Sequence, residues 1–398
     1  MKKRKLANIA YNIEGQPMFK VLDKVNKMEA EGMNIIHFEI GDPDFDTPKH
    51  IIDACCKSLY SGETHYISSM GLKDLRESVV RATEKSRGFK PDIEQVLITP
   101  GANIIIYLTV KCLVNPGEEV ILPDPGFPTY NSVIKLCDVK SIRIPLKEEN
   151  KFRMNPNDIR KAITPKTRLI IINSPNNPCG SVMTPEEIDE VYKIAHENNI
   201  WILSDEIYSR MIYDNTKFYS PSMNDYCKHT TIVANGFSKS FAMTGWRLGV
   251  AIGPAELIAK MNLLIQTLCS CVSPFIQRAG ITAIEENQYE TLKMMNIYKE
   301  RRDIIIKGLN DIPGVSCVNN KGAFYAFPNI TKTGMTSEEF ADFILDKAKV
   351  AILPGTNFGK YGEGYVRLSY VIDINDIKEG LKRMKKAVEE HNKEGIKK

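Results

Sequence analysis

The stretch TTIVANGFSKSFAMTGWRLGVAIG, residues 230–253, indicates both the fold class and the position of a site. Its two ends, TTIVAN and RLGVAIG, are short apolar runs, and one lysine, Lys239, lies between them among aromatic and small residues. Continuously apolar runs of this length are typical of strands that are covered on both faces of a sheet. We therefore expect two strands of a buried sheet, with Lys239 in the segment that connects them.

The same pattern recurs through residues 95–253. Earlier runs of this kind are QVLITPG, EVILPDPG, RLIIINSP and IWILSDEIY. A segment typical of a helix, PEEIDEVYKIAHENN, separates the last two, with Thr184 as its N-cap and Pro185 in its first turn. Buried strands that alternate with helices predict an α/β fold, with a large domain whose mostly parallel central sheet is flanked by helices.

The pattern changes beyond residue 254. Residues 254–309 predict long helices, and the runs GAFYAFPNI, VAILPGTNFG and GYVRLSYV predict strands around the helix SEEFADFILDKAK. These elements form a second, smaller α+β unit. The segment FKVLDKVNKMEAEG near the start predicts a helix that cannot make a domain alone, so we expect it to pack on this C-terminal unit.

Composition limits the class of protein. The chain has 398 residues and a formal net charge of only +4, with no basic arm that would favour nucleic-acid binding. Lysines interrupt the most apolar windows well short of membrane-spanning length, and the N-terminus does not read as a secretory signal. The nine cysteines and six histidines show no metal-ligand spacing. We therefore expect a cytoplasmic protein that binds no metal, nucleic acid or membrane.

A different polar or aromatic group follows each of five apolar runs: TPGAN, PDPGFPTY, SPNNPCG, SDEIY and GFSK. Ligands of open parallel sheets bind outside the carboxyl ends of the strands, so these segments are expected to line one crevice. Taken singly, each segment can also be explained as ordinary turn chemistry, because Pro, Gly, Asn, Asp and Ser are the residues that turns use.

Lys239 is the hardest of these residues to explain as part of a turn. Its neighbours Phe237, Phe241 and Trp246 are aromatic, and an amine held in apolar surroundings has a lowered pKa and becomes a nucleophile towards carbonyl compounds. The alternative is a side chain that extends to solvent. Arg247 can equally be one half of a surface ion pair.

Pyridoxal 5'-phosphate is a cofactor that would use all of these segments. It needs a lysine for a Schiff base and an acid against its pyridine nitrogen, and Lys239 and Asp205 are the candidates for these roles. Tyr208 and Asn177 are candidates for hydrogen bonds to the ring hydroxyl, and Phe127 for stacking on the ring face.

The cofactor's phosphate would lie where PGAN enters a helix. The backbone N–H groups of Ala102 and Asn103, together with the positive end of the helix dipole, attract an anion at that point. Ser238 and Arg247 are expected to complete the phosphate site. One cofactor would thus account for motifs that are far apart in the chain.

These motifs resemble those of the class I and II, fold-type I aminotransferases. GFSKSFAMTGWRLG is similar to the family's lysine signature, while NNPCG and SDEIY resemble its Asn-Pro-x-Gly and Asp-x-x-Tyr elements. GDPDFDTP and YVRLSY also resemble family motifs, so the resemblance extends from about residue 10 to 390. It implies a large cofactor-binding domain at 46–300, a small α+β domain at 301–398, and an N-terminal segment, 1–45, that packs on the small domain.

The resemblance also implies contacts that the motifs alone do not. Arg367 would pair with the α-carboxylate of the substrate, and Gly41 and Asn177 would be further substrate contacts. Tyr66 would reach the phosphate of the cofactor in the neighbouring subunit, which implies a homodimer with shared active sites.

The predicted reaction moves an amino group between an L-amino acid and a 2-oxo acid through a Schiff base on Lys239, whose amine also transfers the α-proton. The same fold and lysine support other chemistry, so the alternative is a pyridoxal-phosphate lyase that performs C–S β-elimination, or a decarboxylase. A nicotinamide dehydrogenase is disfavoured because the chain has no GxGxxG after its first strand.

Three departures from aspartate-selective members of the resembled family bear on the substrate. Asn103 stands where such members carry a lysine, and Pro17 and Met18 stand where they tend to carry hydroxyl residues. The segment LCSCVSPF, residues 268–275, offers no arginine for a side-chain carboxylate. We therefore expect an enzyme that is not strictly specific for aspartate.

Overall fold

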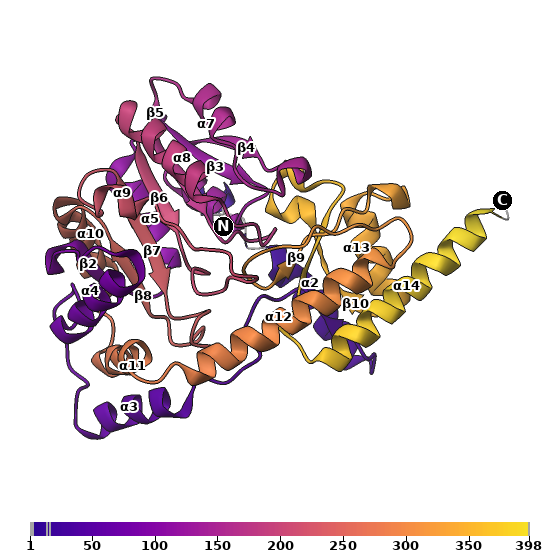
Figure 1. Cartoon of the computed structure of the whole chain (residues 1–398), viewed down its shortest axis with the longest axis horizontal. Coiled ribbons are helices and arrows are strands. Elements are labelled where there is room, and N and C mark those ends of the chain that lie inside the picture. Colours follow the sequence, from indigo (N-terminus) through magenta and orange to yellow (C-terminus); the bar gives the residue numbers. More distant parts are fainter. Residues whose placement is uncertain (1–3, 13–14, 16, 397–398) are drawn as a thin grey trace.

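The computed structural model describes residues 4–12, 15 and 17–396. Its largest sheet has seven strands in the order β2-β8-β7-β6-β5-β3-β4 (Figure 1). The neighbouring strands from β4 to β7 pair in parallel, whereas β8 is antiparallel to both β7 and β2. The predicted fold class, a mostly parallel sheet flanked by helices, is confirmed. The strands are β2 (Val96–Thr99), β3 (Glu119–Asp124), β4 (Lys140–Pro145), β5 (Thr167–Asn173), β6 (Trp201–Asp205), β7 (Thr231–Gly236) and β8 (Gly249–Ile252).

Helices cover both faces of this sheet. The helices of this part of the chain are α3 (Lys49–Tyr60), α4 (Lys73–Arg87), α5 (Asn103–Leu113), α6 (Pro128–Leu136), α7 (Pro156–Ala162), α8 (Pro185–Glu197), α9 (Ser222–Asp225), α10 (Ala255–Cys269) and α11 (Pro274–Glu285). Strand β5 shows why the apolar runs are continuous. Leu169 and Ile171 pack with α5, α6 and α10, while Ile170 and Ile172 pack on the opposite face with α7 and α8. Because helices cover both faces of the strand, its residues are apolar on both sides. The alternation of polar and apolar residues that is typical of a half-exposed strand is therefore absent.

The start of α8 has the predicted capping chemistry. The side chain of Thr184 accepts a hydrogen bond from Glu187 N at 3.2 Å, and the Glu187 carboxylate accepts one from Thr184 N at 3.0 Å. Pro185 occupies the first helical position. This capping box satisfies backbone groups that the helix itself cannot pair.

A smaller lobe is built from the C-terminal elements, with α12 running from the large sheet part into it (Figure 1). Strands β11, β12 and β9 form an antiparallel sheet in that order. The predicted boundary at residue 300 falls inside α12, so both parts of the molecule share this helix. The elements are α12 (Tyr289–Asn310), β9 (Tyr325–Ala326), α13 (Ser337–Ala348), β10 (Val350–Ala351), β11 (Leu353–Pro354), β12 (Val366–Ser369) and α14 (Ile374–Ile396).

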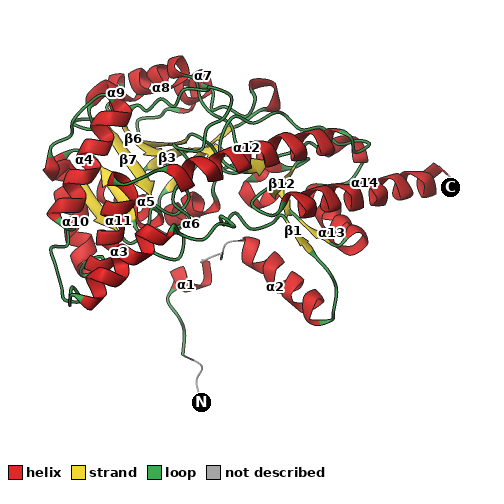
Figure 2. Ribbon diagram, turned by 60° about the horizontal axis from the view of Figure 1, so that its bottom comes forward, coloured by secondary structure: helices red, strands yellow, loops and turns green. Residues whose placement is uncertain are grey.

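Helix α2 and strand β1, which precede the large sheet part in the chain, lie beside this smaller lobe (Figure 2). After α1 (Asn8–Asn12) and α2 (Pro17–Ala30), strand β1 (Ile36–His37) pairs in parallel with β10. Val25 of α2 is buried with Leu345 and Ala351, and Lys24 forms a 2.8 Å ion pair with Asp342 of α13. The chain leaves β1 towards the large sheet, which brings Gly41 to the junction of the two parts.

None of the helices in the described part of the chain is both long and apolar enough to span a membrane. Within the same residues, no group of three or more His, Cys, Asp or Glu side chains is placed to hold a metal ion.

Candidate active site at the carboxyl ends of the strands

A cavity of about 340 Å³ opens where the large sheet meets the smaller lobe. Almost all of the predicted site residues line it. From the large sheet part these are Ala102, Asn103, Phe127, Asn177, Asp205, Tyr208, Ser238, Lys239 and Arg247. Ile106, Asn173, Ile207 and Thr244 of the same part also line it, and Met18, Gly41, Tyr325 and Arg367 join them from the other side, while the side chain of Pro17 is outside the described part of the chain. Segments that look like separate turns in the sequence therefore converge on one space.

Tyr66 is the one predicted site residue that the structure leaves outside this cavity. Its side chain is 86% exposed on the surface of the single chain.

Lys239 follows strand β7 and extends into the cavity. Its Nζ donates a 2.6 Å hydrogen bond to the backbone carbonyl of Gly41 and lies 5.6 Å from the centre of the Phe324 ring. Burial lowers the pKa of the Lys239 amine to about 8, which the charge of Asp42 partly offsets. A lowered pKa leaves more of the amine neutral near pH 7, which is the form that attacks a carbonyl carbon.

Asp205 ends strand β6 and presents a buried carboxyl group to the same cavity. Tyr130 Oη donates a 2.6 Å hydrogen bond to Oδ2, and the backbone N–H of Ile207 donates one of 3.2 Å to Oδ1. Burial nevertheless raises the pKa of Asp205 to about 6, although both hydrogen bonds lower it. A desolvated carboxylate of this kind favours a cation beside it.

The start of helix α5 also borders the cavity. Its first residue is Asn103 and its N-cap is Ala102, and Gly101 before it has φ +82°. A Cβ atom on Gly101 would lie 2.4 Å from Arg247 Nη2, so only glycine lets this guanidinium approach the start of the helix. Arg247 is held there by a 2.8 Å hydrogen bond from Nη1 to the Thr244 carbonyl. A helix N-terminus and a guanidinium thus form a cationic cradle suited to a phosphate.

Arg367 lies at the side formed by the smaller lobe. It is 1% exposed, and no carboxylate of the described residues lies within ion-pair distance of it, although the charge of Glu39 acts on it. Its Nη1 donates to Asn177 Oδ1 at 3.2 Å and its Nη2 to the Glu39 carbonyl, while Nε has no partner. The ring of Tyr325 stacks 4.6 Å from the guanidinium carbon. A buried cation with an unused N–H group and no carboxylate in direct contact is suited to a carboxylate ligand.

Sequence reasoning missed three residues of this site. Tyr130 lies within the quoted segment PDPGFPTY, one helical turn after Phe127, and this spacing was the available signal. Asn173 accepts a 2.9 Å hydrogen bond from Asn177 N and donates one of 3.1 Å to the Asp205 carbonyl, which ties two strand ends together. Tyr325 lies in a run that is otherwise typical of a core strand, so its sequence carries no signal of a site.

A model of the family described as aminotransferase class I and II matches residues 33–384 of this chain. The chain belongs to that family. As a member of it, the protein is a pyridoxal-phosphate-dependent aminotransferase.

Among curated relatives of this aminotransferase is the aspartate aminotransferase of Pyrococcus horikoshii, 43% identical over 372 residues that cover 93% of this chain and 94% of the relative. The aromatic-amino-acid aminotransferase 2 of Thermococcus litoralis is 39% identical and covers 97% of this chain and 95% of the relative. A solved structure of alanine aminotransferase from Pyrococcus furiosus superposes with a TM-score of 0.92 at 32% identity, covering 97% of this chain and 100% of that one.

The cavity of this aminotransferase fits its cofactor. Lys239 has an amine whose pKa is lowered, Asp205 has a buried carboxyl group that would suit a protonated ring nitrogen, and Gly101, which lacks a Cβ atom, lets Arg247 approach the start of α5, where a phosphate would bind. These three groups line the same cavity or border it, and each needs a ligand of complementary charge or reactivity.

Proposed function

We propose that this aminotransferase accepts neutral and aromatic L-amino acids and is not confined to aspartate. The observation that carries the proposal is the distribution of charge in the cavity. Its cationic side chains, among the described residues, are Lys239, Arg247 and Arg367. These three have roles towards the cofactor and the α-carboxylate, so a second carboxylate on the substrate would find no cation of its own.

The rest of the cavity wall supports the same conclusion. Met18, Ile106, Phe127 and Ile207 are apolar or aromatic, and the cavity's Asn103 is a neutral residue. Apolar walls stabilise an apolar substrate side chain by excluding water from it. Relatives of the chain include enzymes named for aspartate, for aromatic amino acids and for alanine, so the family accommodates each of these choices.

When bound, pyridoxal phosphate supplies an aldehyde that condenses with amines and a ring that accepts electrons when a bond to the α-carbon breaks. The Lys239 amine holds the cofactor and, once released, takes a proton from the substrate α-carbon and returns one, as base and then acid. Asp205 would keep a proton on the ring nitrogen, and Tyr130 holds Asp205 in place through its hydrogen bond to Oδ2.

The other residues of the cavity bind and orient. Tyr208 and Asn177 would donate hydrogen bonds to the ring hydroxyl, and Phe127 would stack on the ring face. The N–H groups of Ala102 and Asn103 would bind the phosphate together with Ser238 and Arg247, while Gly41, Asn177 and Arg367 would receive the substrate carboxylate.

We further propose a homodimer in which Tyr66 reaches the partner's phosphate. Support comes from apolar side chains that one chain leaves exposed on α3 and α10: Ile52, Leu59, Tyr60, Leu263 and Leu268. Such residues are typical of an interface when they cluster.

We also propose that residues 1–45 and 301–398 act as a small domain that closes on the large domain, 46–300. We propose in addition that the enzyme is cytoplasmic, and its nine unpaired cysteines support this location.

The test is one panel of amino donors. The cofactor-loaded enzyme is incubated with 2-oxoglutarate and, in turn, alanine, phenylalanine, methionine and aspartate, and glutamate formation is measured. We expect kcat/KM for at least one neutral donor to equal or exceed that for aspartate. A large preference for aspartate over all three others would overturn the proposed donor class, and pyruvate or ammonia released from a cysteine conjugate without an acceptor would indicate lyase chemistry.

A further inference from the structure

Two buried tyrosines join the two parts of the molecule beside the cavity. The hydroxyl of Tyr208, which follows strand β6, lies 2.7 Å from the hydroxyl of Tyr325 on strand β9. Tyr208 is 4% exposed and Tyr325 is 2% exposed. Burial raises the pKa of both phenols, so each hydroxyl keeps its single proton at neutral pH.

A count of protons decides the direction of this hydrogen bond. A tyrosine hydroxyl has one O–H to donate, although its oxygen can accept more than one bond. If Tyr208 donates that proton to the ring oxygen of the cofactor, its own oxygen is left as an acceptor. The 2.7 Å contact then requires Tyr325 to donate to Tyr208.

We propose that Tyr325 is a positioning residue that strengthens the hydrogen bond from Tyr208 to the cofactor's ring oxygen and holds Arg367 in place with the same ring. The proposal rests on the proposed role of Tyr208. Donation into a hydroxyl oxygen polarises its O–H group, so successive hydrogen bonds reinforce one another.

The ring of Tyr325 has the second contact that this role needs. The Arg367 guanidinium carbon lies 4.6 Å from its centre, and a Cβ atom on Gly41 would lie 2.3 Å from its hydroxyl oxygen. One side chain therefore touches the arginine for the substrate carboxylate, the Gly41 segment and the donor to the cofactor.

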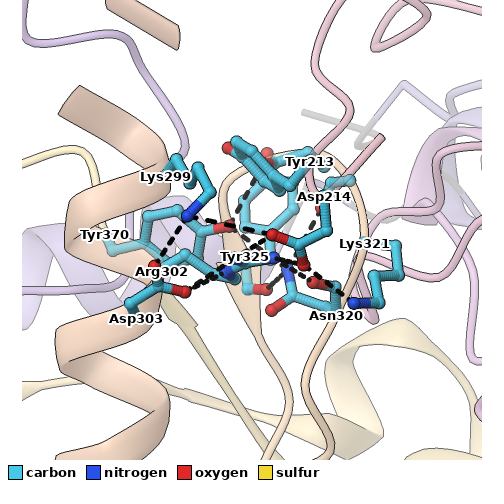
Figure 3. Close-up of polar contacts among 11 residues, drawn as sticks. Tyr213, Asp214, Lys299, Arg302, Asp303, Asn320, Lys321, Tyr325 and Tyr370 are labelled. Carbon is cyan, nitrogen blue, oxygen red and sulfur yellow. Dashed lines mark hydrogen bonds and ion pairs between the residues drawn. The ribbon is translucent and has the colours of Figure 1, made fainter. Parts of the chain in front are cut away.

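A buried frame holds Tyr325 in this position (Figure 3). Asn320 Nδ2 donates a 2.8 Å hydrogen bond to the Tyr325 carbonyl, and Arg302 Nη1 donates one of 3.1 Å to the Asn320 carbonyl. Arg302 is 1% exposed and binds Asp214 through two hydrogen bonds of 2.7 and 2.9 Å. Since the backbone is fixed by other residues, replacing the tyrosine by phenylalanine removes only the hydroxyl group.

The test uses Tyr325→Phe, which keeps the ring against Arg367. With less donation into Tyr208, its hydroxyl would stabilise negative charge on the ring oxygen less well, so the Lys239 nitrogen of the loaded protein would keep its proton to a higher pH. The pH midpoint of the near-visible absorbance change of the cofactor-loaded protein is therefore expected to rise, by about half a unit. The charged groups around Lys239, namely Asp42, Asp205, Arg247 and Arg367, are the same in both proteins. The KM for the amino donor should change less than about twofold, because the ring face remains, while kcat falls by about threefold or more.

Tyr370→Phe is the matched control. Tyr370 is a fully buried tyrosine of the same frame, and its hydroxyl donates to the Ala323 carbonyl at 3.2 Å and accepts from Asn320, with no contact to Tyr208. The Tyr370→Phe variant should therefore have the same pH midpoint as the wild type. Tyr208→Phe should raise the midpoint further than Tyr325→Phe, and the double variant should match Tyr208→Phe alone, because Tyr325 acts through Tyr208.

Three results would overturn the inference: an unchanged midpoint in Tyr325→Phe, an equal shift in Tyr370→Phe, or additive shifts in the double variant. The proposed role of Tyr208 fails separately, if Tyr208→Phe itself leaves the midpoint of the loaded protein unchanged. A wild-type protein that shows no near-visible band with pyridoxal phosphate would instead contradict the assignment of Lys239.

Discussion

Tyr130 donates a 2.6 Å hydrogen bond to Oδ2 of Asp205, and both side chains are buried under the cavity. The contact fixes the orientation of the carboxyl group but does not compensate for the loss of water, because the pKa of Asp205 is still raised to about 6. A carboxylate that is costly to ionise in the empty protein becomes favourable once a protonated ring nitrogen lies beside it. The free energy of cofactor binding therefore depends on this pair.

The first prediction is a pH dependence of cofactor affinity. The folded pKa of Asp205 is raised from 3.8 to about 6, so the apoprotein loses stability as pH rises through 6, and a bound cation restores it. Affinity for pyridoxal phosphate should consequently weaken as pH falls below about 6. This affinity is measured by fluorescence titration of the apoprotein with pyridoxal phosphate at several pH values between 5 and 8. Asp205→Asn should bind more weakly and lose that pH dependence, and an unchanged profile in the variant would count against the assignment.

A second prediction concerns the rate at which the apoprotein captures its cofactor. Burial lowers the pKa of Lys239 to about 8, so below that value the neutral fraction of its amine increases about tenfold for each unit by which the pH rises. The rate of the absorbance change after mixing with pyridoxal phosphate should rise from pH 6.5 and level off above about 8. Lys239→Arg, which keeps a cation at this position, should show no such phase. A rate that is flat over this range would contradict the lowered pKa.

Much of this site was predictable because it follows from sheet geometry. Lys239, Asp205 and Asn177 each come directly after an apolar run, and parallel strands bring such positions to one edge. The sequence does not show that β8 runs antiparallel to its neighbours, since an apolar run reads the same in either direction. Tyr325 could not be predicted either, because its role comes from contacts with Tyr208 and Arg367, which are far from it in the chain.

The third prediction separates binding from stability at Arg367. This side chain is buried without a carboxylate partner, so its charge costs stability in the empty protein, and burial lowers its pKa. Arg367→Gln should leave the melting temperature of the apoprotein unchanged or raised, while KM for every amino donor increases by about 100-fold. The KM of Arg367→Lys should lie between that of the wild type and that of Arg367→Gln, because an ammonium group keeps the charge but not the paired geometry. A KM that stays within twofold in both variants would remove Arg367 from the carboxylate site.

Gly101 supports a fourth prediction, with a control in the same chain. Both Gly101 and Gly88 have positive φ, +82° and +75°, so alanine at either position strains the backbone by about 1 kcal/mol. Only at Gly101 does the added Cβ atom meet Arg247, at 2.4 Å, whereas nothing lies within 4 Å at Gly88. Gly101→Ala should release pyridoxal phosphate faster on dialysis, and Gly88→Ala should retain it like the wild type. Equal retention in the two variants would show that Arg247 does not bind the phosphate.

The most direct test of the central claim is to find where the cofactor is attached. The protein loaded with pyridoxal phosphate is reduced with borohydride, digested, and its peptides are sequenced by mass spectrometry. We predict one pyridoxyl adduct, on Lys239 in the peptide that contains GFSKSFAMTGWR, and none in Lys239→Ala. An adduct on another lysine, or loss of the near-visible band with no adduct at all, would contradict the assignment of this cavity as the active site.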